Sequence, residues 1–324
     1  LTYTESGAHN MKKRLAEMIG SSAYKVTIST FHGFANELIA RYPEKFSGII
    51  GGIPATEVEE IVMVKNILDD GIAKALRLPG DSYYYVDPAL RSIHTLKREG
   101  LTPEVFGQLL DAEERAIAEA PDRVHEKGAY KGRVKKDYID AEWSLGRSRA
   151  LFELYREYQK RLRETKRFDY EDMILETVRA MESDHDFLLI LQEEYQYLLA
   201  DEHQDTNNGQ NRILELLASF HLNPNLFVVG DEKQAIYRFQ GASIANFLYF
   251  QRKYPDVLYI TLTENYRSTQ SILDSAQALI GKEASEAELK LRVPLIASKK
   301  SDGVLTGTPI VVAHLSTPRA ELEY

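Results

Sequence analysis

The stretch YQYLLADEHQDTNNGQNRILELLASFHLNPNLFVVGD, residues 195–231, decides the fold. Two short apolar runs, Tyr195–Asp201 and Asn225–Asp231, flank a helical pattern at Asn208–Phe220. Near-continuous runs rich in Leu, Val and Phe are typical of strands buried on both faces of a parallel sheet. A strand, a helix and a second strand in this order predict a right-handed crossover between parallel neighbours. The stretch therefore predicts an α/β protein with a parallel sheet.

The same alternation extends to both sides of this stretch. Lys25–Thr30 and Val257–Leu262 are two further predicted strands, and Pro309–Leu315 is a late candidate. Helices are predicted at Glu5–Ile19, ahead of the first strand, and at Arg267–Ile280, after the fourth.

Residues 51–165 have a different pattern, because helical periodicity dominates there without a convincing strand. Asp87-Pro88 and Thr102-Pro103 each place a capping side chain before a proline, which predicts two helix starts. Apolar and aromatic residues also recur at helical spacing. They are Leu151, Leu154, Tyr155, Tyr158 and Leu162. We expect a helical subdomain inserted between the first and second strands.

The composition excludes several classes of protein. The chain has 324 residues, 44% of them hydrophobic, and contains no cysteine. A disulfide framework, thiol catalysis and a cysteine-ligated metal site are therefore excluded for this chain. No run approaches the roughly 18 apolar residues that a membrane span needs. We expect a cytoplasmic protein without a membrane partner.

The charge is unevenly distributed. The net charge is −9, yet residues 127–167 hold 13 Lys and Arg against 6 Asp and Glu, which is +7. Such a basic segment can be a phosphate-contacting face or simply the solvated surface of a helix, and charge alone favours the second.

Polar side chains follow the predicted strands at the edge where α/β sheets bind ligands. Asp201 and Glu202 end an apolar strand, which is the Walker B arrangement. The first carboxylate can hold Mg²⁺ and the second can take a proton from an attacking water. A capping acid at a polar strand end is the structural alternative for the dipeptide alone.

Further candidates follow the third and fourth strands. Gln234 can contact a γ-phosphate or orient the water, although a simple turn would also explain it. Arg267 can neutralise transferring phosphate charge, and Tyr266 offers a ring to a base. A surface salt bridge is the alternative for Arg267. Tyr237 and Phe239 suit base stacking or core packing.

Together these segments resemble the UvrD/Rep family of superfamily 1 DNA helicases. The resemblance covers almost the whole chain, and the motifs stand in family order. They are LTYTESGAHNMKKRL at 1–15 (motif Ia), TFHGFA at 30–35 (Ib), RFDYEDMI at 167–174 (the return from the helical insertion), LLADEHQDTNNGQ at 198–210 (II), VVGDEKQAIYRFQGA at 228–242 (III) and LTENYRS at 262–268 (IV).

The resemblance implies a RecA-like P-loop NTPase core with an inserted all-helical subdomain. It implies subdomain 1A at 1–50 and 166–260, the helical insertion 1B at 51–165, and the start of subdomain 2A at 261–324. The implied activity is ATP-dependent 3′→5′ translocation on single-stranded DNA and unwinding of 3′-tailed duplex, in repair, replication or recombination.

Residue by residue, the resemblance implies the following roles. Asp201 would bind Mg²⁺, Glu202 would be the catalytic base, and Gln234 would sense the γ-phosphate of ATP. Arg267 would contact that phosphate and Tyr266 would stack near the adenine. The implied DNA contacts are Tyr3, Thr30, Phe31, His32, Tyr237 and Phe239.

The sequence departs from the family pattern at several positions. Tyr3 and His203 stand where Phe is usual, Phe239 replaces the Trp of some members, and Gln240 replaces a common Arg. The sequence contains no G-x-x-x-x-G-K-[ST] phosphate loop, and the late family motifs V and VI are missing. We therefore expect an internal fragment of a longer helicase, inactive alone.

Three alternatives remain open from the sequence. The first is a catalytically silent DNA-binding or scaffolding module, which the intact acids disfavour. The second is the helicase part of a helicase–nuclease. The third is a metal-dependent nuclease that uses Asp201, His203, Asp205 and Asp231.

Overall fold

The computed structural model describes residues 1–324 except 129, 232–233, 235–249, 251–252, 282–293 and 299–324. It divides into two compact units, residues 1–252 and 253–324. The predicted start of the second ATPase half, residue 261, lies inside the second unit. The late strand candidate Pro309–Leu315 lies outside the described residues.

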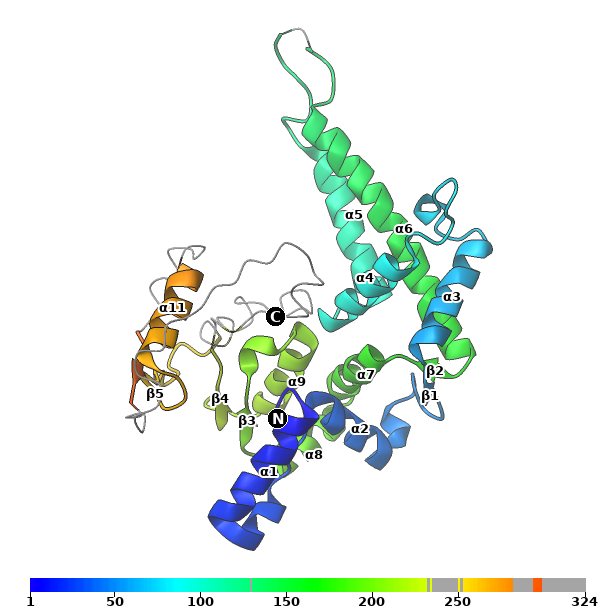
Figure 1. The fold of residues 1–324 in the computed structure, drawn as a ribbon. Helices are drawn as coiled ribbons and strands as arrows, with labels where there is room; N and C mark the ends of the chain where they lie inside the picture. The colour runs from blue at the N-terminus through cyan, green and yellow to red at the C-terminus, as the bar shows by residue number, and fades with distance from the viewer. Residues whose placement is uncertain (129, 232–233, 235–249, 251–252, 282–293, 299–324) are drawn as a thin grey trace, which may run out of the picture. The chain divides into compact units, whose positions relative to one another are not determined.

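The described strands form three short parallel pairs. In the first unit, β3 (Leu198–Ala200) pairs with β4 (Leu226–Val228), and α9 (Asn208–Ala218) connects them. This is the strand–helix–strand unit that residues 195–231 predict. The protein is thus a helix-rich α/β fold with small parallel sheets (Figure 1). A continuous RecA-like sheet stays a prediction.

Two of the predicted strands are wrong. Lys25–Thr30 is not a strand. Its first residue, Lys25, ends a 3₁₀ helix (η1, Gly20–Lys25), and its last residue, Thr30, forms only a single bridge to Thr2. Val257–Leu262 is not a strand either. The ladder of the second unit begins later, where β5 (Glu264–Asn265) pairs with β6 (Ile296–Ala297). A β-favouring sequence cannot supply the neighbouring strand that its backbone needs.

The helices of the first unit follow the sequence closely. The predicted helix α1 (Glu5–Ile19) begins at the capping hydroxyl of Thr4, and Gly20 follows it with φ of 61°. Helices α2 (Phe31–Arg41), α7 (Tyr170–Ser183) and α8 (His185–Glu194) complete this part, with the short turns η2 (Pro43–Lys45) and η4 (His203–Asp205). Its core consists of buried apolar side chains from these helices and α9. They include Phe34, Leu38, Phe187, Leu191 and Ile213.

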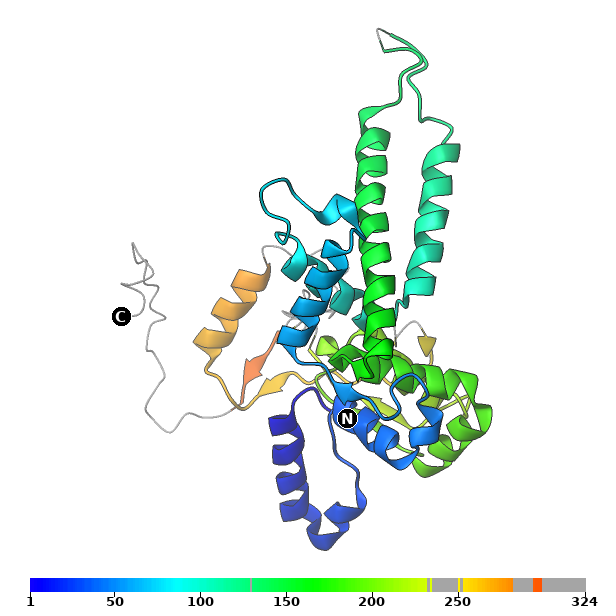
Figure 2. The ribbon, with the colours of Figure 1, turned by 90° about the vertical axis from the view of Figure 1, so that its right-hand side faces the viewer.

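Four further helices form a group between β1 (Ile53–Pro54) and β2 (Arg167–Phe168), which pair with each other. They are α3 (Glu57–Asp69), α4 (Val86–Arg98), α5 (Pro103–Glu119) and α6 (Lys136–Glu164), with the turn η3 (Lys74–Leu76). Helices α5 and α6 run side by side as a long pair (Figures 1 and 2). The β1–β2 pairing brings the two ends of this segment together, as an insertion requires.

Sequence periodicity predicts the core of this group correctly. Leu154, Tyr155, Tyr158 and Leu162 of α6 are buried against Ile67 and Ile93 of α3 and α4. The predicted cap Thr102 begins α5, with Pro103 in its first turn. The other predicted start is wrong by two residues, because α4 begins at Val86 rather than at Pro88.

The second unit also contains α11 (Gln270–Gly281), which begins three residues later than predicted. Among the described helices, none combines the length and the apolar character that a membrane crossing requires.

Candidate functional site

The backbone around β3 brings two predicted motifs to one sheet edge. The Val229 N–H donates to the carbonyl of Ala200 at 2.8 Å, and the His203 N–H donates to the carbonyl of Val229 at 2.9 Å. The Asp201 N–H donates to the carbonyl of Leu1 at 3.0 Å. The residues that follow β3 and β4 therefore meet at the carboxyl ends of the strands, beside the start of the chain.

The chain turns sharply at the acid pair. Glu202 has φ of 51°, a left-handed conformation that costs a non-glycine residue about 1–2 kcal/mol. The turn η4 follows at once and buries His203 and Gln204 while the Glu202 side chain stays exposed. Backbone strain of this kind is often found at functional sites, because the surrounding structure must hold it in place.

A chain of hydrogen bonds then links the two motifs. The Gln204 amide nitrogen donates to Glu202 Oε2 at 2.7 Å, and its Oε1 accepts from the Asp231 N–H at 3.0 Å. The Gln234 amide nitrogen donates to Asp231 Oδ2 at 3.0 Å. Three of the predicted site residues, Asp201, Glu202 and Gln234, thus belong to one local arrangement around β3 and β4.

The carboxylates at this edge suit a hard cation. Asp201 is partly exposed at the strand end, and Asp205 lies three residues beyond Glu202. Burial raises the pKa of Asp205, the negative charge of Glu202 adds to this, and the hydrogen bond from Gln204 opposes it. Carboxylate oxygens are the protein ligands that Mg²⁺ prefers, so the donor set fits Mg²⁺ held mainly by Asp201.

The His203 side chain is buried, unlike that of the neighbouring Glu202. Its ring is fully buried, its Nε2 lies 2.9 Å from Asn211 Oδ1, and it meets the Phe250 ring edge-to-face. Burial lowers the pKa of His203 to about 4, so the ring is neutral at pH 7. Among the described residues, the nuclease candidates Asp201, His203, Asp205 and Asp231 do not gather into a metal-binding group.

The predicted DNA contacts in the first unit differ in exposure. Phe31 is 1% exposed and packs in the core. The buried Thr30 hydroxyl caps α2 by accepting from the Gly33 N–H, and it donates to Glu5. These two side chains offer no surface to DNA in this conformation, because core packing and capping already use them.

His32 and Tyr3 keep partial exposure. The His32 ring stacks on Tyr170 at 3.9 Å between centroids. Burial, with the charge of Arg98, lowers the pKa of His32 to about 4, so it cannot act as a cation at pH 7. Tyr237 and Phe239 lie outside the described residues.

Tyr266 and Arg267 belong to the second unit, where both are exposed. The Asn265 side chain accepts from the backbone N–H groups of Arg267 and Ser268, at 3.0 and 2.8 Å. The Tyr266 hydroxyl donates to Glu264, and this hydrogen bond raises the pKa of Tyr266. The turn thus fixes the backbone from which both side chains project.

The basic segment 127–167 is partly neutralised within the protein. At least five of its thirteen basic side chains pair with acids, namely Lys135, Arg149, Lys160, Arg161 and Arg167. Several of these acids lie outside the segment, such as Asp70, Asp111 and Asp122. This favours the structural interpretation of the charge excess.

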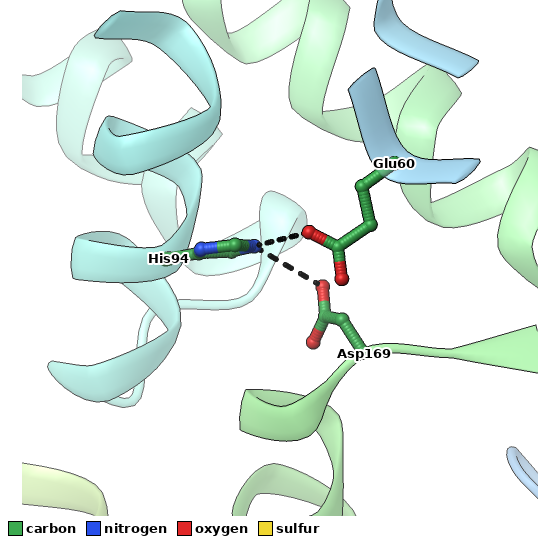
Figure 3. A group of neighbouring side chains, drawn as sticks. All are labelled: Glu60, His94 and Asp169. Carbon is green, nitrogen blue, oxygen red and sulfur yellow. Dashed lines mark ion pairs between the residues drawn. The ribbon is translucent and has the colours of Figure 1, made fainter. Parts of the chain in front are cut away.

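A second polar cluster lies at the base of the helical group. Within the described part of the chain, Glu60, His94 and Asp169 bring three potential ligand atoms within 4.8 Å of one another (Figure 3). His94 Nε2 lies 3.2 Å from Glu60 and 4.0 Å from Asp169. The Lys97 ammonium, however, already binds the same Asp169 oxygen and lies 2.8 Å from Asp172. The lysine thus neutralises one of the three candidate ligands, and we interpret the cluster as structural.

Sequence reasoning missed two residues in these clusters. Gln204 lies in the quoted motif, but no residue pattern assigned it a partner. Lys97 lies on the buried apolar face of α4, four residues after Ile93, and only the tertiary structure shows that it pairs there with Asp169 and Asp172. One available signal was RFDYEDMI, in which Asp169 and Asp172 form a capping box.

Comparison with known proteins agrees with this arrangement. A sequence model of the UvrD/REP helicase N-terminal domain matches residues 1–255. The ATP-dependent DNA helicase PcrA of Bacillus subtilis is 30% identical over 283 residues, which cover 86% of this chain and 32% of that protein. The PcrA of Leuconostoc citreum is 30% identical over 295 residues, which cover 90% of this chain and 34% of that protein.

A third relative is the PcrA of Staphylococcus aureus, 29% identical over 281 residues, or 86% of this chain and 33% of that protein. The chain thus spans about a third of the length of these relatives. The family match covers well over half of the chain and includes both motifs at the β3–β4 edge. The chain belongs to the UvrD/REP helicase family.

Proposed function

We propose that this chain is part of an ATP-dependent DNA helicase that translocates 3′→5′ on single-stranded DNA and unwinds 3′-tailed duplex. Its proposed setting is the repair, replication or recombination of DNA in the cytoplasm, at the nucleoid if the source is bacterial. The observation that carries the proposal is the chain of hydrogen bonds at the carboxyl edge of β3 and β4, which links Glu202 through Gln204 and Asp231 to Gln234. Ligands bind at this edge in open α/β sheets.

The acid pair divides the work between its two carboxylates. Asp201 follows the buried strand directly, so its position is set by β3, and it would hold Mg²⁺. Mg²⁺ bound with ATP would supply neutralisation of phosphate charge. Glu202 projects from the strained turn into solvent, where a water molecule can reach it. It would accept the proton of that water as general base.

The remaining nucleotide contacts come from two places. Gln234 is exposed at the end of its hydrogen-bond chain and would sense the γ-phosphate. Arg267 would contact the same phosphate, and the exposed Tyr266 would stack near the adenine. An exposed turn held by Asn265 is compatible with both roles.

For the DNA track, we propose contacts at Tyr3, His32, Tyr237 and Phe239, through stacking rather than charge. Thr30 and Phe31 would support this surface from beneath, because the first caps α2 and the second packs in the core.

The proposal also predicts what the chain cannot do alone. The sequence contains no G-x-x-x-x-G-K-[ST], whose backbone N–H groups and lysine cradle the phosphates of ATP. Phosphoryl transfer depends mostly on positioning and charge stabilisation, so the acid pair would have no held substrate. We therefore expect no measurable DNA-stimulated ATPase from residues 1–324 alone.

The test is a steady-state ATPase assay with and without single-stranded DNA. Residues 1–324 are compared with a longer protein that includes the phosphate loop and the late helicase motifs. DNA-stimulated turnover by the longer protein alone supports the proposal. Equal turnover by both would contradict the expected inactivity of residues 1–324 alone. No turnover by either would contradict the assignment of the protein as an enzyme.

A further inference from the structure

Gln204 occupies an unusual position for an uncharged polar side chain. It is 1% exposed, yet each end of its amide group meets a different motif. Its nitrogen lies 2.7 Å from Glu202 Oε2 and 3.3 Å from Asp205 Oδ2, and its oxygen lies 3.0 Å from the Asp231 nitrogen. A buried amide that loses such partners is costly, so the contacts hold the side chain in place.

The chemistry of the partners fixes the orientation of this amide. A backbone N–H can only donate, so the Asp231 N–H requires the Gln204 oxygen. The amide nitrogen must then face the two carboxylates, which accept from it. Neither a carboxylate nor an ammonium at position 204 could satisfy both sides, whereas a side-chain amide combines an acceptor and two donors without charge.

The position matters because of the turn that precedes it. Glu202 adopts the left-handed conformation and its side chain is exposed, so packing does not hold its carboxylate. The turn η4 places Gln204 beneath it, where one amide hydrogen can fix one carboxylate oxygen. The other oxygen stays available to a water molecule. A base held in one geometry gains rate, because misplacement by about 1 Å can cost about 100-fold.

We propose that Gln204 is a positioning residue for hydrolysis, which holds the Glu202 carboxylate and ties its orientation to Asp231, whose side chain accepts a hydrogen bond from Gln234. The inference deepens the proposed function and rests on the assignment of Glu202 as the base. Gln204 touches neither water nor nucleotide in this role. Its effect passes entirely through Glu202, and this distinguishes it from a residue that only stabilises the turn.

Two substitutions separate the contacts of Gln204. Gln204→Met keeps the approximate volume and removes all of its hydrogen bonds. Gln204→Glu keeps an oxygen for the Asp231 N–H and replaces the donor that faces Glu202 by a second negative charge. Gln192→Met is the matched control, because Gln192 is also buried and loses two hydrogen bonds, to Leu216 and Ser219, at a distance from the acid pair.

The experiment measures ATP turnover and nucleotide affinity in the full-length helicase. We expect both Gln204 variants to lower kcat by about 10- to 100-fold with KM and ATP affinity nearly unchanged. We expect Gln192→Met to keep wild-type kcat. Wild-type kcat in Gln204→Glu, or a loss of ATP affinity that accounts for the whole effect, would overturn the proposal. If Gln204→Met does not fold, Gln204→Glu alone decides.

A double-mutant cycle with Glu202→Gln supplies the readout that a structural role would not move. In single-turnover assays, Gln204→Met should slow wild-type hydrolysis but leave the residual rate of Glu202→Gln unchanged. An equal slowing in both backgrounds would show that Gln204 acts independently of Glu202 and would overturn the inference. Normal turnover by Glu202→Gln itself would instead contradict the base assignment of the proposed function.

Discussion

Two strands of the first unit are followed by acidic residues, and these acids differ in their burial and in their bonding partners. Asp169 follows β2, is fully buried and binds the Lys97 ammonium, which also pairs with Asp172. Asp201 and Glu202 follow β3, are partly or fully exposed, and Glu202 takes its hydrogen bond from the neutral amide of Gln204. A strand that ends in a carboxylate therefore does not by itself mark a catalytic site.

The acids at the two strand ends differ because Asp169 is bound by the ammonium of Lys97, whereas Glu202 is bound by the neutral amide of Gln204. A buried carboxylate needs a cation beside it, because an isolated buried charge is very unfavourable. Burial alone would lower the pKa of Lys97, but the charges of Asp169 and Asp172 outweigh it and raise that pKa. Such a pair joins α4 to α7 and leaves no carboxylate for chemistry. The acids at β3 have no such lysine paired with them among the described residues, and their proposed roles need exposed carboxylates.

Of the changes that test this comparison, replacing the proposed base Glu202 should have the largest effect, and the effect should be on ATP turnover. In the full-length protein, Glu202→Gln should lower kcat for ATP by about 100- to 10,000-fold while ATP binding persists, because an amide cannot accept the water proton. Steady-state ATPase and nucleotide-binding assays measure the two quantities. Glu153→Gln, an exposed change on α6, should keep wild-type turnover. Near-normal turnover by Glu202→Gln would remove the catalytic role of the β3 acids.

The buried ion pair should matter for folding instead. Lys97→Met leaves the buried carboxylates of Asp169 and Asp172 without their cation and should lower the free energy of unfolding by about 3–5 kcal/mol. Urea denaturation measures the change. The control is Lys135→Met, which breaks the exposed pair with Asp122 and should cost about 1 kcal/mol or less. Equal losses in the two variants would mean that the Lys97 cluster contributes no more than a surface pair.

His203 and His94 predict opposite responses to pH, and the larger response belongs to His203. Burial lowers its pKa from 6.5 to about 4, so its contribution to stability is complete above pH 6.5 and falls as the pH drops toward 4. In this range the free energy of unfolding should fall by up to about 1.4 kcal/mol for each pH unit. His203→Phe should remove this slope, since a phenyl ring can still meet Phe250. Unfolding curves at pH 7.0 and 5.0 test it, and an unchanged acid response would contradict the prediction.

His94 at the β2 end should give the smallest effect, with the opposite sign. Burial alone would lower its pKa, but the hydrogen bond to Glu60 and the charges of Glu171 and Asp169 raise it above 6.5. Its contribution is therefore complete below pH 6.5 and is lost as the pH rises through the raised pKa. His94→Gln should remove about 1 kcal/mol or less at pH 6 and still less at pH 9. The exposed His9→Gln serves as control, and a larger loss at pH 9 than at pH 6 would refute the sign.

The sequence predicted elements whose signals are local. Helix α1 matches its predicted bounds, because Thr4 and Gly20 mark its ends chemically. The α5 start at Thr102-Pro103 and the buried face of α6 follow from capping and periodicity in the same way. The run Val257–Leu262 was mispredicted as a strand, because a strand also depends on a neighbouring strand that the run itself does not contain.

In the candidate site, too, some features follow from the local sequence and others only from tertiary packing. By itself, the sequence determined the order of the motifs and the chemical identity of Asp201, Glu202 and Gln234, since strand ends and residue types can be read along one chain. Tertiary structure decided that Phe31 packs in the core, that Lys97 neutralises Asp169, and that Gln204 joins Glu202 to Asp231. Burial and the pairing of distant groups are set by packing between elements, which no single stretch of sequence specifies.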